Sequence, residues 1–168
     1  GCTGRYTRAT NRLHELIATR LGAPLHVRVA TTLPSPQCAI DVPGQATVKD
    51  FLLGLIDWCR HVVRLPPAAV ELIKPHWNGK GPLIDPHGEQ RLPIEFSRPR
   101  TGGEPPLAEL VITPAKDADA ATHSPPLPHF EIRCERGWAR FSDPLQIAWA
   151  GEREEGQESL VSERAEVE

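Results

Sequence analysis

Residues 25–74 read LHVRVATTLPSPQCAIDVPGQATVKDFLLGLIDWCRHVVRLPPAAVELIK, and this stretch decides the fold that the sequence predicts. Apolar and polar residues alternate over 25–29 and again over 38–42, as in two half-buried strands joined by a turn. Residues 47–64 carry apolar groups at steps of three and four, which predicts a helix with a broad apolar face. Two prolines then forbid continuation of the helix. The stretch therefore predicts a hairpin, a helix that crosses it and a further strand from Val70.

The flanking segments predict one more helix and several more strands. Residues 8–21 place their apolar groups on a single helical stripe. The segment from Glu152 to the end holds seven Glu and two Arg, and reads as an acidic tail or an exposed helix. Alternating or apolar segments predict strands at 94–96, 107–113, 129–134, 138–141 and 145–149.

Composition narrows the classes of function. The 18 prolines are about twice the usual share of roughly 5%, and they cluster between the expected elements. The net charge is −3 and no basic stripe carries interleaved aromatic residues, so we expect no nucleic-acid partner. No apolar run reaches the ~18–20 residues of a membrane span.

Three of the four cysteines fall at apolar positions of the predicted strands and helix, which indicates buried thiols and a cytoplasmic protein. The chain begins Gly1-Cys2, so we expect a processed or trimmed product.

Five segments occur in the order and spacing of a known superfamily: TTLPSP, ATVKDFLLGLI, LPPAAVELI, GKGPLIDPHGEQ and LAELVIT. The chain resembles the ubiquitin-like branch of the β-grasp superfamily over a little more than half of its length. The resemblance implies an α+β fold, a mixed β-grasp sheet crossed by one helix, with an N-terminal helix and extra C-terminal strands. The expected divisions are an N-terminal helical extension (1–23), a β-grasp domain (24–114), a proline-rich connector (115–128), C-terminal strands (129–150) and an acidic tail (151–168).

The resemblance also implies a partner-binding face on the outer surface of the sheet. Carried over by position, that face holds Leu33, Ile73 and Val111. The alternation of strand side chains agrees for Ile73, since Val70 and Leu72 would point to the helix. Extra C-terminal strands could instead cover this face and make it core, and the sequence leaves both alternatives open.

The predicted function is that of a non-enzymatic interaction module, an adaptor, scaffold or assembly subunit that binds protein partners in a larger complex, with no cofactor. One alternative is a ubiquitin-like modifier of a bacterial conjugation system, matured by proteolysis. The chain ends at Glu168 and not in the Gly-Gly tail that such conjugation needs, although Gly102 and Gly103 occur internally. A second alternative is a small enzyme with a Cys/His site built from loops.

Other candidate sites have simpler explanations. Cys59 and His61 lie two positions apart on the predicted helix, so their side chains point about 200° apart and cannot meet. His76, Asp85 and His87 could form a two-His, one-carboxylate metal site, but they lack the spacing of a zinc motif and we expect no metal.

Two further motifs each have a functional and a simpler interpretation. Residues 78–81 (NGKG) resemble part of a phosphate loop, but the rest of that motif is missing and a tight turn is expected. The aromatic residues of the last strands are either core or a peptide-binding groove: Phe130, Trp138, Phe141 and Trp149.

Overall fold

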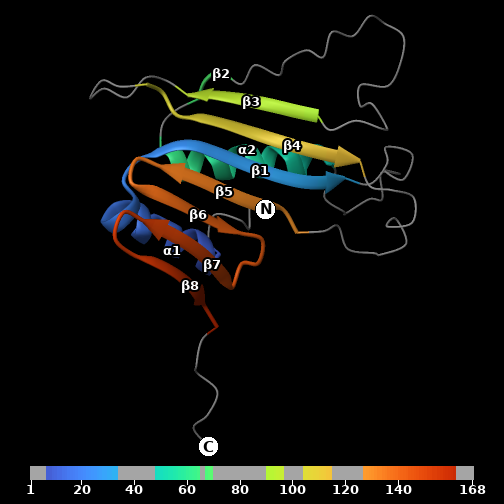
Figure 1. Ribbon diagram of the computed structural model, residues 1–168. Helices are drawn as coiled ribbons and strands as arrows, with labels where there is room; N and C mark the ends of the chain where they lie inside the picture. Colours follow the sequence, from blue (N-terminus) through green and yellow to red (C-terminus); the bar gives the residue numbers. More distant parts are fainter. Residues whose placement is uncertain are drawn as a thin grey trace, which may run out of the picture.

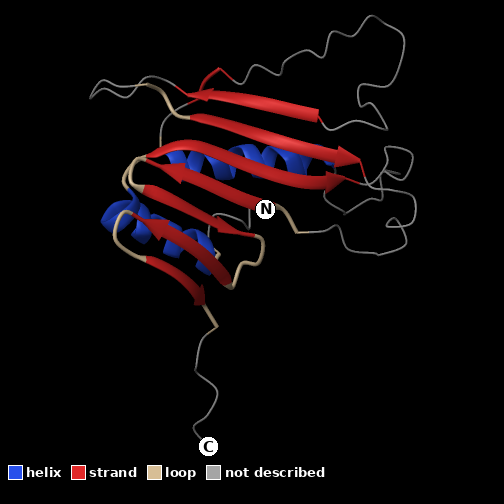
Figure 2. Ribbon diagram, in the orientation of Figure 1, coloured by secondary structure: helices blue, strands red, loops and turns tan. Residues whose placement is uncertain are grey.

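One large sheet with helices on one of its faces makes up the described part of the chain (Figures 1 and 2). The computed structural model describes residues 7–33, 48–64, 67–69, 90–96, 104–114 and 127–161. The helical segments are α1 (Arg8–Leu16), the π-helix η2 (Ile17–Leu21) and α2 (Val48–Val63). The strands are β1 (Pro24–Leu33), β2 (Pro67–Ala69), β3 (Gln90–Phe96), β4 (Leu107–Pro114), β5 (His129–Cys134), β6 (Gly137–Phe141), β7 (Gln146–Gly151) and β8 (Glu155–Ser159).

The eight strands are ordered β2-β3-β4-β1-β5-β6-β7-β8. Only β1 and β4 run parallel, whereas the other six neighbouring pairs are antiparallel. A parallel pair needs a crossover connection, and α2 lies in the connection between β1 and β4. In Figure 1, α2 lies behind β4, β1 and β5, and α1 lies behind β6 and β7.

The core fills the space between the sheet and the helices. Trp58 of α2 is 1% exposed, and its ring centroid lies 4.4 Å from that of Phe130 and 5.9 Å from that of Phe141. Its indole Nε1 donates to the hydroxyl of Thr10 in α1 at 3.0 Å, so the two helices are also joined to each other. A buried indole N–H needs such an acceptor, since an unpaired polar group in the core is costly.

Local sequence explains where the helices begin and end. The Thr7 hydroxyl accepts from the backbone N–H of Thr10 at 3.2 Å and caps the start of α1. Gly22, at φ 76°, ends η2 in a backbone region that glycine tolerates. Arg64 closes α2 in the left-handed region at φ 58°, where a glycine is more usual. Among the described residues, no helix is long and apolar enough to cross a membrane.

The predicted helices are present, but the predicted β-grasp fold is wrong. Both edges of β1 are occupied, by β4 along 26–33 and by β5 along 24–30, so no hairpin partner can pair with β1 there. The C-terminal strands do not cover the sheet face, since they extend the sheet sideways from β1. The segment expected to be an acidic tail contributes the last strand, β8. The predicted strands at 38–42 and 70–72 lie outside the described residues.

Candidate functional site

A row of alternating charges crosses the face of the sheet that points away from the helices. The register places Arg28 of β1 between Glu109 of β4 and Glu131 of β5, and places Glu131 beside Arg140 of β6. These positions alternate with core residues on the helix side, such as Val27. The row therefore reads Glu, Arg, Glu, Arg across four adjacent strands, with Arg28 and Glu131 at its centre.

Glu109 is the point where most of these charges converge. Its carboxylate lies 3.7 Å from His26 Nε2, 3.7 Å from Arg28 Nε and 3.8 Å from an Arg91 nitrogen. The Glu109 side chain is 18% exposed, although it is ionic. The guanidinium groups of Arg28 and Arg91 therefore attract the Glu109 carboxylate at ion-pair distance. Each such cross-strand pair contributes about 0.2–1 kcal/mol.

Apolar groups lie beside the charged row on the same face. Leu107, His26, Arg133 and Trp138 are successive partners along the next row of the register. Leu107 and Trp138 are exposed, and the Arg140 guanidinium lies 5.1 Å from the centre of the Trp138 ring. This combination of aromatic, aliphatic and arginine side chains is typical of a protein-binding surface.

The outer side of α2 is a second candidate surface. Asp50, Leu53, Gly54 and Asp57 follow one another at steps of three, one and three, which places them on one side of the helix. Leu53 is 50% exposed, and a Cβ added to Gly54 would meet nothing within 4 Å. Two carboxylates therefore lie on the same side of α2 as an exposed apolar side chain.

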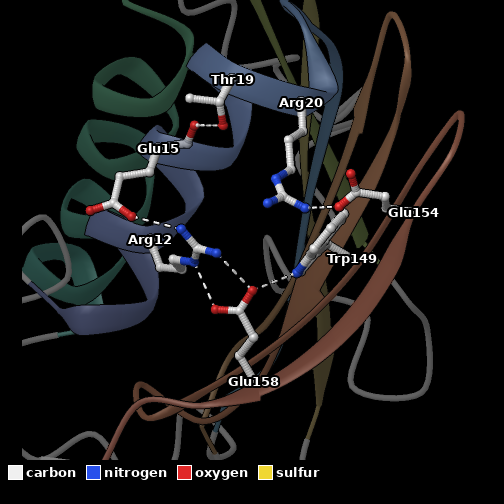
Figure 3. A network of polar contacts seen from close by, with 7 residues as sticks. All are labelled: Arg12, Glu15, Thr19, Arg20, Trp149, Glu154 and Glu158. Atoms are coloured by element: carbon white, nitrogen blue, oxygen red, sulfur yellow. Dashed lines mark hydrogen bonds and ion pairs between the residues drawn. The ribbon is translucent and has the colours of Figure 1, made fainter.

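A third polar cluster joins α1 and η2 to the end of the sheet (Figure 3). Arg12 Nε and Nη2 donate to the two carboxylate oxygens of Glu158 at 2.7 and 2.9 Å, and Trp149 Nε1 donates to Glu158 at 2.8 Å. The Arg12 hydrogen bond is the main cause that lowers the pKa of Glu158. Arg20 pairs with Glu154 and lies 4.9 Å from the centre of the Trp149 ring. We interpret this cluster as structural, because each charge in it has a partner within the chain.

A histidine pair lies where α1 meets the end of α2. The rings of His14 and His61 are 4.8 Å apart edge to face, and Arg64 Nη2 lies 3.3 Å from His14 Nδ1. Arginine can only donate, so His14 accepts through Nδ1 and is neutral. Burial first, and then the charges of Arg64 and His61, lower the pKa of His14 to about 4.

The structure places the predicted binding residues as follows. Val111 lies in β4 on the face away from the helices, but it is 2% exposed and offers almost no surface to a partner. Leu33 is the last residue of β1, at the end of the described segment. Ile73 lies outside the described residues altogether. The partner-binding role of these three residues stays a prediction.

The structure describes the cysteine candidates but not the histidine candidates for a metal site. Burial raises the pKa of the Cys59 and Cys134 thiols to about 12, so neither is a ready nucleophile. His76, Asp85, His87 and residues 78–81 lie outside the described ranges. Within those ranges no three His, Cys, Asp or Glu side chains gather as a metal site.

The aromatic residues of the last strands are divided between the two faces of the sheet. Phe130, Phe141 and Trp149 pack in or against the core, and Trp138 lies on the opposite face. The charged row has no signal in the sequence, because its members become neighbours only through the register of separate strands.

Comparison with known proteins links the fold to a class of enzymes. No family model and no curated protein matches the sequence. Among solved structures, levoglucosan dehydrogenase in complex with NADH and L-sorbose matches with a TM-score of 0.58 at 16% identity, over 96% of this chain and 46% of that chain. UDP-N-acetylglucosamine 3-dehydrogenase GnnA from Acidithiobacillus ferrooxidans matches with a TM-score of 0.58 at 14% identity, over 96% and 46%. An oxidoreductase from Sinorhizobium meliloti matches with a TM-score of 0.57 at 13% identity, over 92% and 40%.

The fold is therefore one found in oxidoreductases, and this chain spans less than half the length of those enzymes. This finding overturns the resemblance to ubiquitin-like proteins. The fold matches are to dehydrogenases and oxidoreductases. They therefore also contradict the predicted functions of a non-enzymatic adaptor, scaffold or assembly subunit and of a ubiquitin-like modifier.

Proposed function

We propose that this chain is the sheet-forming half of a nicotinamide-dependent oxidoreductase that acts on a sugar. The observation that carries the proposal is the fold likeness over almost the whole chain to two sugar dehydrogenases with different substrates, levoglucosan and UDP-N-acetylglucosamine. The reaction class would be the reversible oxidation of a sugar hydroxyl group to a carbonyl group. A reducing, cytoplasmic location fits the buried free thiols of Cys59 and Cys134.

The described residues do not fit a dinucleotide. Dinucleotide-binding folds have a mostly parallel sheet with helices on both faces and a glycine-rich turn at a helix N-terminus. Here one of the seven neighbouring strand pairs is parallel, and both described helices lie on one face. We therefore propose that the cofactor is bound by another part of the gene product that contains this chain.

The surface of this chain that best suits a sugar is the outer side of α2. Asp50 and Asp57 can accept hydrogen bonds from hydroxyl groups, and Leu53 offers an apolar edge to a sugar ring. The open space at Gly54 leaves room for a ligand to approach the helix backbone. This side of the helix therefore combines hydrogen-bond acceptors, an apolar edge and an open approach.

The test is an activity assay on the gene product that contains this chain. Purified protein is incubated with NAD or NADP and a panel of anhydrosugars, free sugars and nucleotide sugars, and the formation of NADH or NADPH is followed by absorbance. We expect turnover of at least one sugar, and at least a tenfold loss of kcat/KM in Asp57→Asn. The matched control is Arg60→Gln, an exposed change on the same helix that should leave turnover within about twofold.

The proposal fails if the purified protein binds neither nucleotide in a titration and oxidises no sugar of the panel. If turnover is found and Asp57→Asn leaves it intact, the assignment of the α2 surface is wrong and the reaction class stands.

A further inference from the structure

The outer edge of β8 is open in the described part of the chain, where β8 is the last strand of the sheet (Figure 1). We propose that this edge pairs antiparallel with β8 of a second copy of the chain, about a two-fold axis at Gln157, so that the two sheets become continuous. The proposal does not depend on the proposed enzymatic function. It rests on the main-chain hydrogen bonds of β8, on the order of its side chains and on the space beside α1.

Alternate residues of β8 turn their main-chain groups toward the open edge. The N–H of Gly151 donates to the carbonyl of Glu154 at 2.8 Å, and the N–H of Leu160 donates to the carbonyl of Leu145 at 2.6 Å. Residues 154 and 160 therefore bond toward β7, and in an antiparallel pair every second residue between them does the same. The remaining residues of β8 direct both N–H and C=O away from β7: Glu155, Gln157 and Ser159. The edge thus offers the donors and acceptors that a further strand needs.

The side chains of β8 complement a second copy in one antiparallel register. With Gln157 opposite its own copy, Glu155 faces Ser159 of the second copy, and Glu158 faces Gly156 of the second copy. A carboxylate then lies beside a hydroxyl donor, and one side-chain amide lies beside another. In this register no two carboxylates of the paired strands are directly opposed, and each of the three outward-facing pairs exchanges two main-chain hydrogen bonds.

Neighbouring registers oppose like charges. An axis one residue earlier, at Gly156, sets Glu154 opposite Glu158 of the second copy. An axis one residue later sets Glu158 opposite its own copy. Like charges that are directly opposite destabilise a pair of strands, so the sequence of β8 favours the register centred on Gln157.

The helix side of the sheet leaves room for this pairing. The Glu158 carboxylate is held by Arg12 and Trp149 at 2.7–2.9 Å, and Gly156 of the second copy brings no side chain against it. Because α1 lies behind β6 and β7, each copy of α1 lies at least as far from the axis as β7 (Figure 1). The two copies of β7 are three strand spacings apart, about 14 Å, whereas packed helices need about 8–10 Å.

The contact is small, so we expect reversible association that grows with concentration. β8 is five residues long, and an edge of that length buries less surface than a stable interface of standard size.

Introduced cysteines report this contact alone, whatever other contacts the copies make. In the gene product that contains this chain, Cys2→Ser and Cys38→Ser form the background, and Glu155→Cys and Ser159→Cys are prepared as separate variants. In either variant alone the two introduced thiols are four residues apart along the paired strands, about 13 Å, which is too far for a disulfide. In an equimolar mixture, position 155 of one variant faces position 159 of the other at about 5.5 Å between Cα atoms, within reach of a disulfide.

We expect oxidation of the mixture to give at least tenfold more covalent dimer than oxidation of either variant alone, measured by gel electrophoresis without reductant. Gln157→Pro, added to both variants, should lower that yield at least tenfold, because it removes the N–H at the centre of the contact. That N–H points away from β7, so the bonds within the sheet remain. Gln157→Ala is the matched control, since it keeps the N–H, and its yield should stay within about threefold.

Circular dichroism checks that each variant is folded. If Gln157→Pro does not fold, the comparison of the mixture with the single variants still decides. A mixture that cross-links no better than the single variants overturns the proposal, and so does a folded Gln157→Pro mixture that cross-links as well as its Gln157→Ala control.

Discussion

The contact between α1 and β8 can be tested by a change of one atom, Glu158→Gln. In the wild type the Glu158 carboxylate accepts two hydrogen bonds from Arg12 and one from the Trp149 indole, at 2.7–2.9 Å (Figure 3). The amide keeps the shape of the side chain, but it loses the charge and turns one acceptor into a donor that faces Arg12 or Trp149. The variant should therefore be less stable while the backbone stays in place.

The size of the loss follows from exposure. Hydrogen bonds to a charged group contribute about 1.5–3 kcal/mol when they are shielded, and fully exposed ion pairs contribute about 0.2–1 kcal/mol. The Arg12 and Glu158 side chains are 28% and 29% exposed, so this pair lies between the two cases. We predict that Glu158→Gln lowers the free energy of unfolding by about 1.5 kcal/mol, which is about 3–6 °C in Tm for a chain of this length.

The assay is thermal and urea unfolding followed by circular dichroism, with Glu15→Gln as the matched control. Glu15 also pairs with Arg12, at 2.8 Å, but it is exposed and lies on the same helix, so its loss should be below about 0.5 kcal/mol. If the two variants lose the same stability, the contact between α1 and β8 does not stabilise β8, and the prediction is wrong.

The stability that Glu158 contributes depends on pH in a definite direction. The pKa of Glu158 is lowered in the folded chain, so its contribution is full above the unfolded value of about 4.3 and is lost as pH falls through the lower folded value. The difference in stability between the wild type and Glu158→Gln should therefore be constant near neutral pH and should shrink in strong acid.

Three further predictions follow from the backbone and from the histidine pair. Gly54→Ala should stabilise the chain by up to about 1 kcal/mol, because the added methyl enters open space in a helix. Gly137→Ala should lower Tm strongly, because its methyl would overlap the backbone of β7. Differential scanning calorimetry of the two variants measures both effects. Arg64→Gly should be more stable than Arg64→Ala by about 1 kcal/mol in urea unfolding, because both lose the side chain and only glycine is relaxed at φ 58°. The pKa of His14 falls from 6.5 to about 4 on folding, so wild-type stability should drop as pH falls from about 6.5 to 4, and this part of the drop should be missing in His14→Gln when Tm is recorded across that range.

The helices were predictable because the spacing of apolar residues that indicates a helix lies within one short segment of the sequence. The apolar stripe of residues 8–21 appears as α1 and η2, and that of residues 47–64 appears as α2. In both segments the spacing of apolar residues fixes which side is buried, whatever the sheet does. The strand at 107–113 and the alternating segments from residue 129 onward were predictable for the same reason.

Strand pairing was not predictable, because it depends on residues far apart in the sequence. The β8 segment EGQES has no apolar alternation, and its pairing with β7 and the bond from Glu158 to Arg12, 146 residues away, hold it in the sheet. The charged row on the sheet was not predictable for the same reason. Arg28, Glu109 and Glu131 are ordinary surface charges in the sequence, and they become one row only when β4 and β5 pair with opposite edges of β1.

The error in the predicted fold can be traced to one edge of one strand. A parallel pair of strands with a helix in the connection occurs here in β1, α2 and β4. The β-grasp resemblance rested on five segments, of which ATVKDFLLGLI lies largely in α2 and LAELVIT lies in β4. The fold then depends on which segment takes the free edge of β1. When β5 takes it, Phe130 comes against Trp58, and β6 follows with Phe141 stacked on Phe130 at 4.8 Å. Large aromatic side chains contribute most per residue to a core. A segment such as 38–42 brings no aromatic residue, so the burial of these rings favours the eight-stranded sheet over a hairpin.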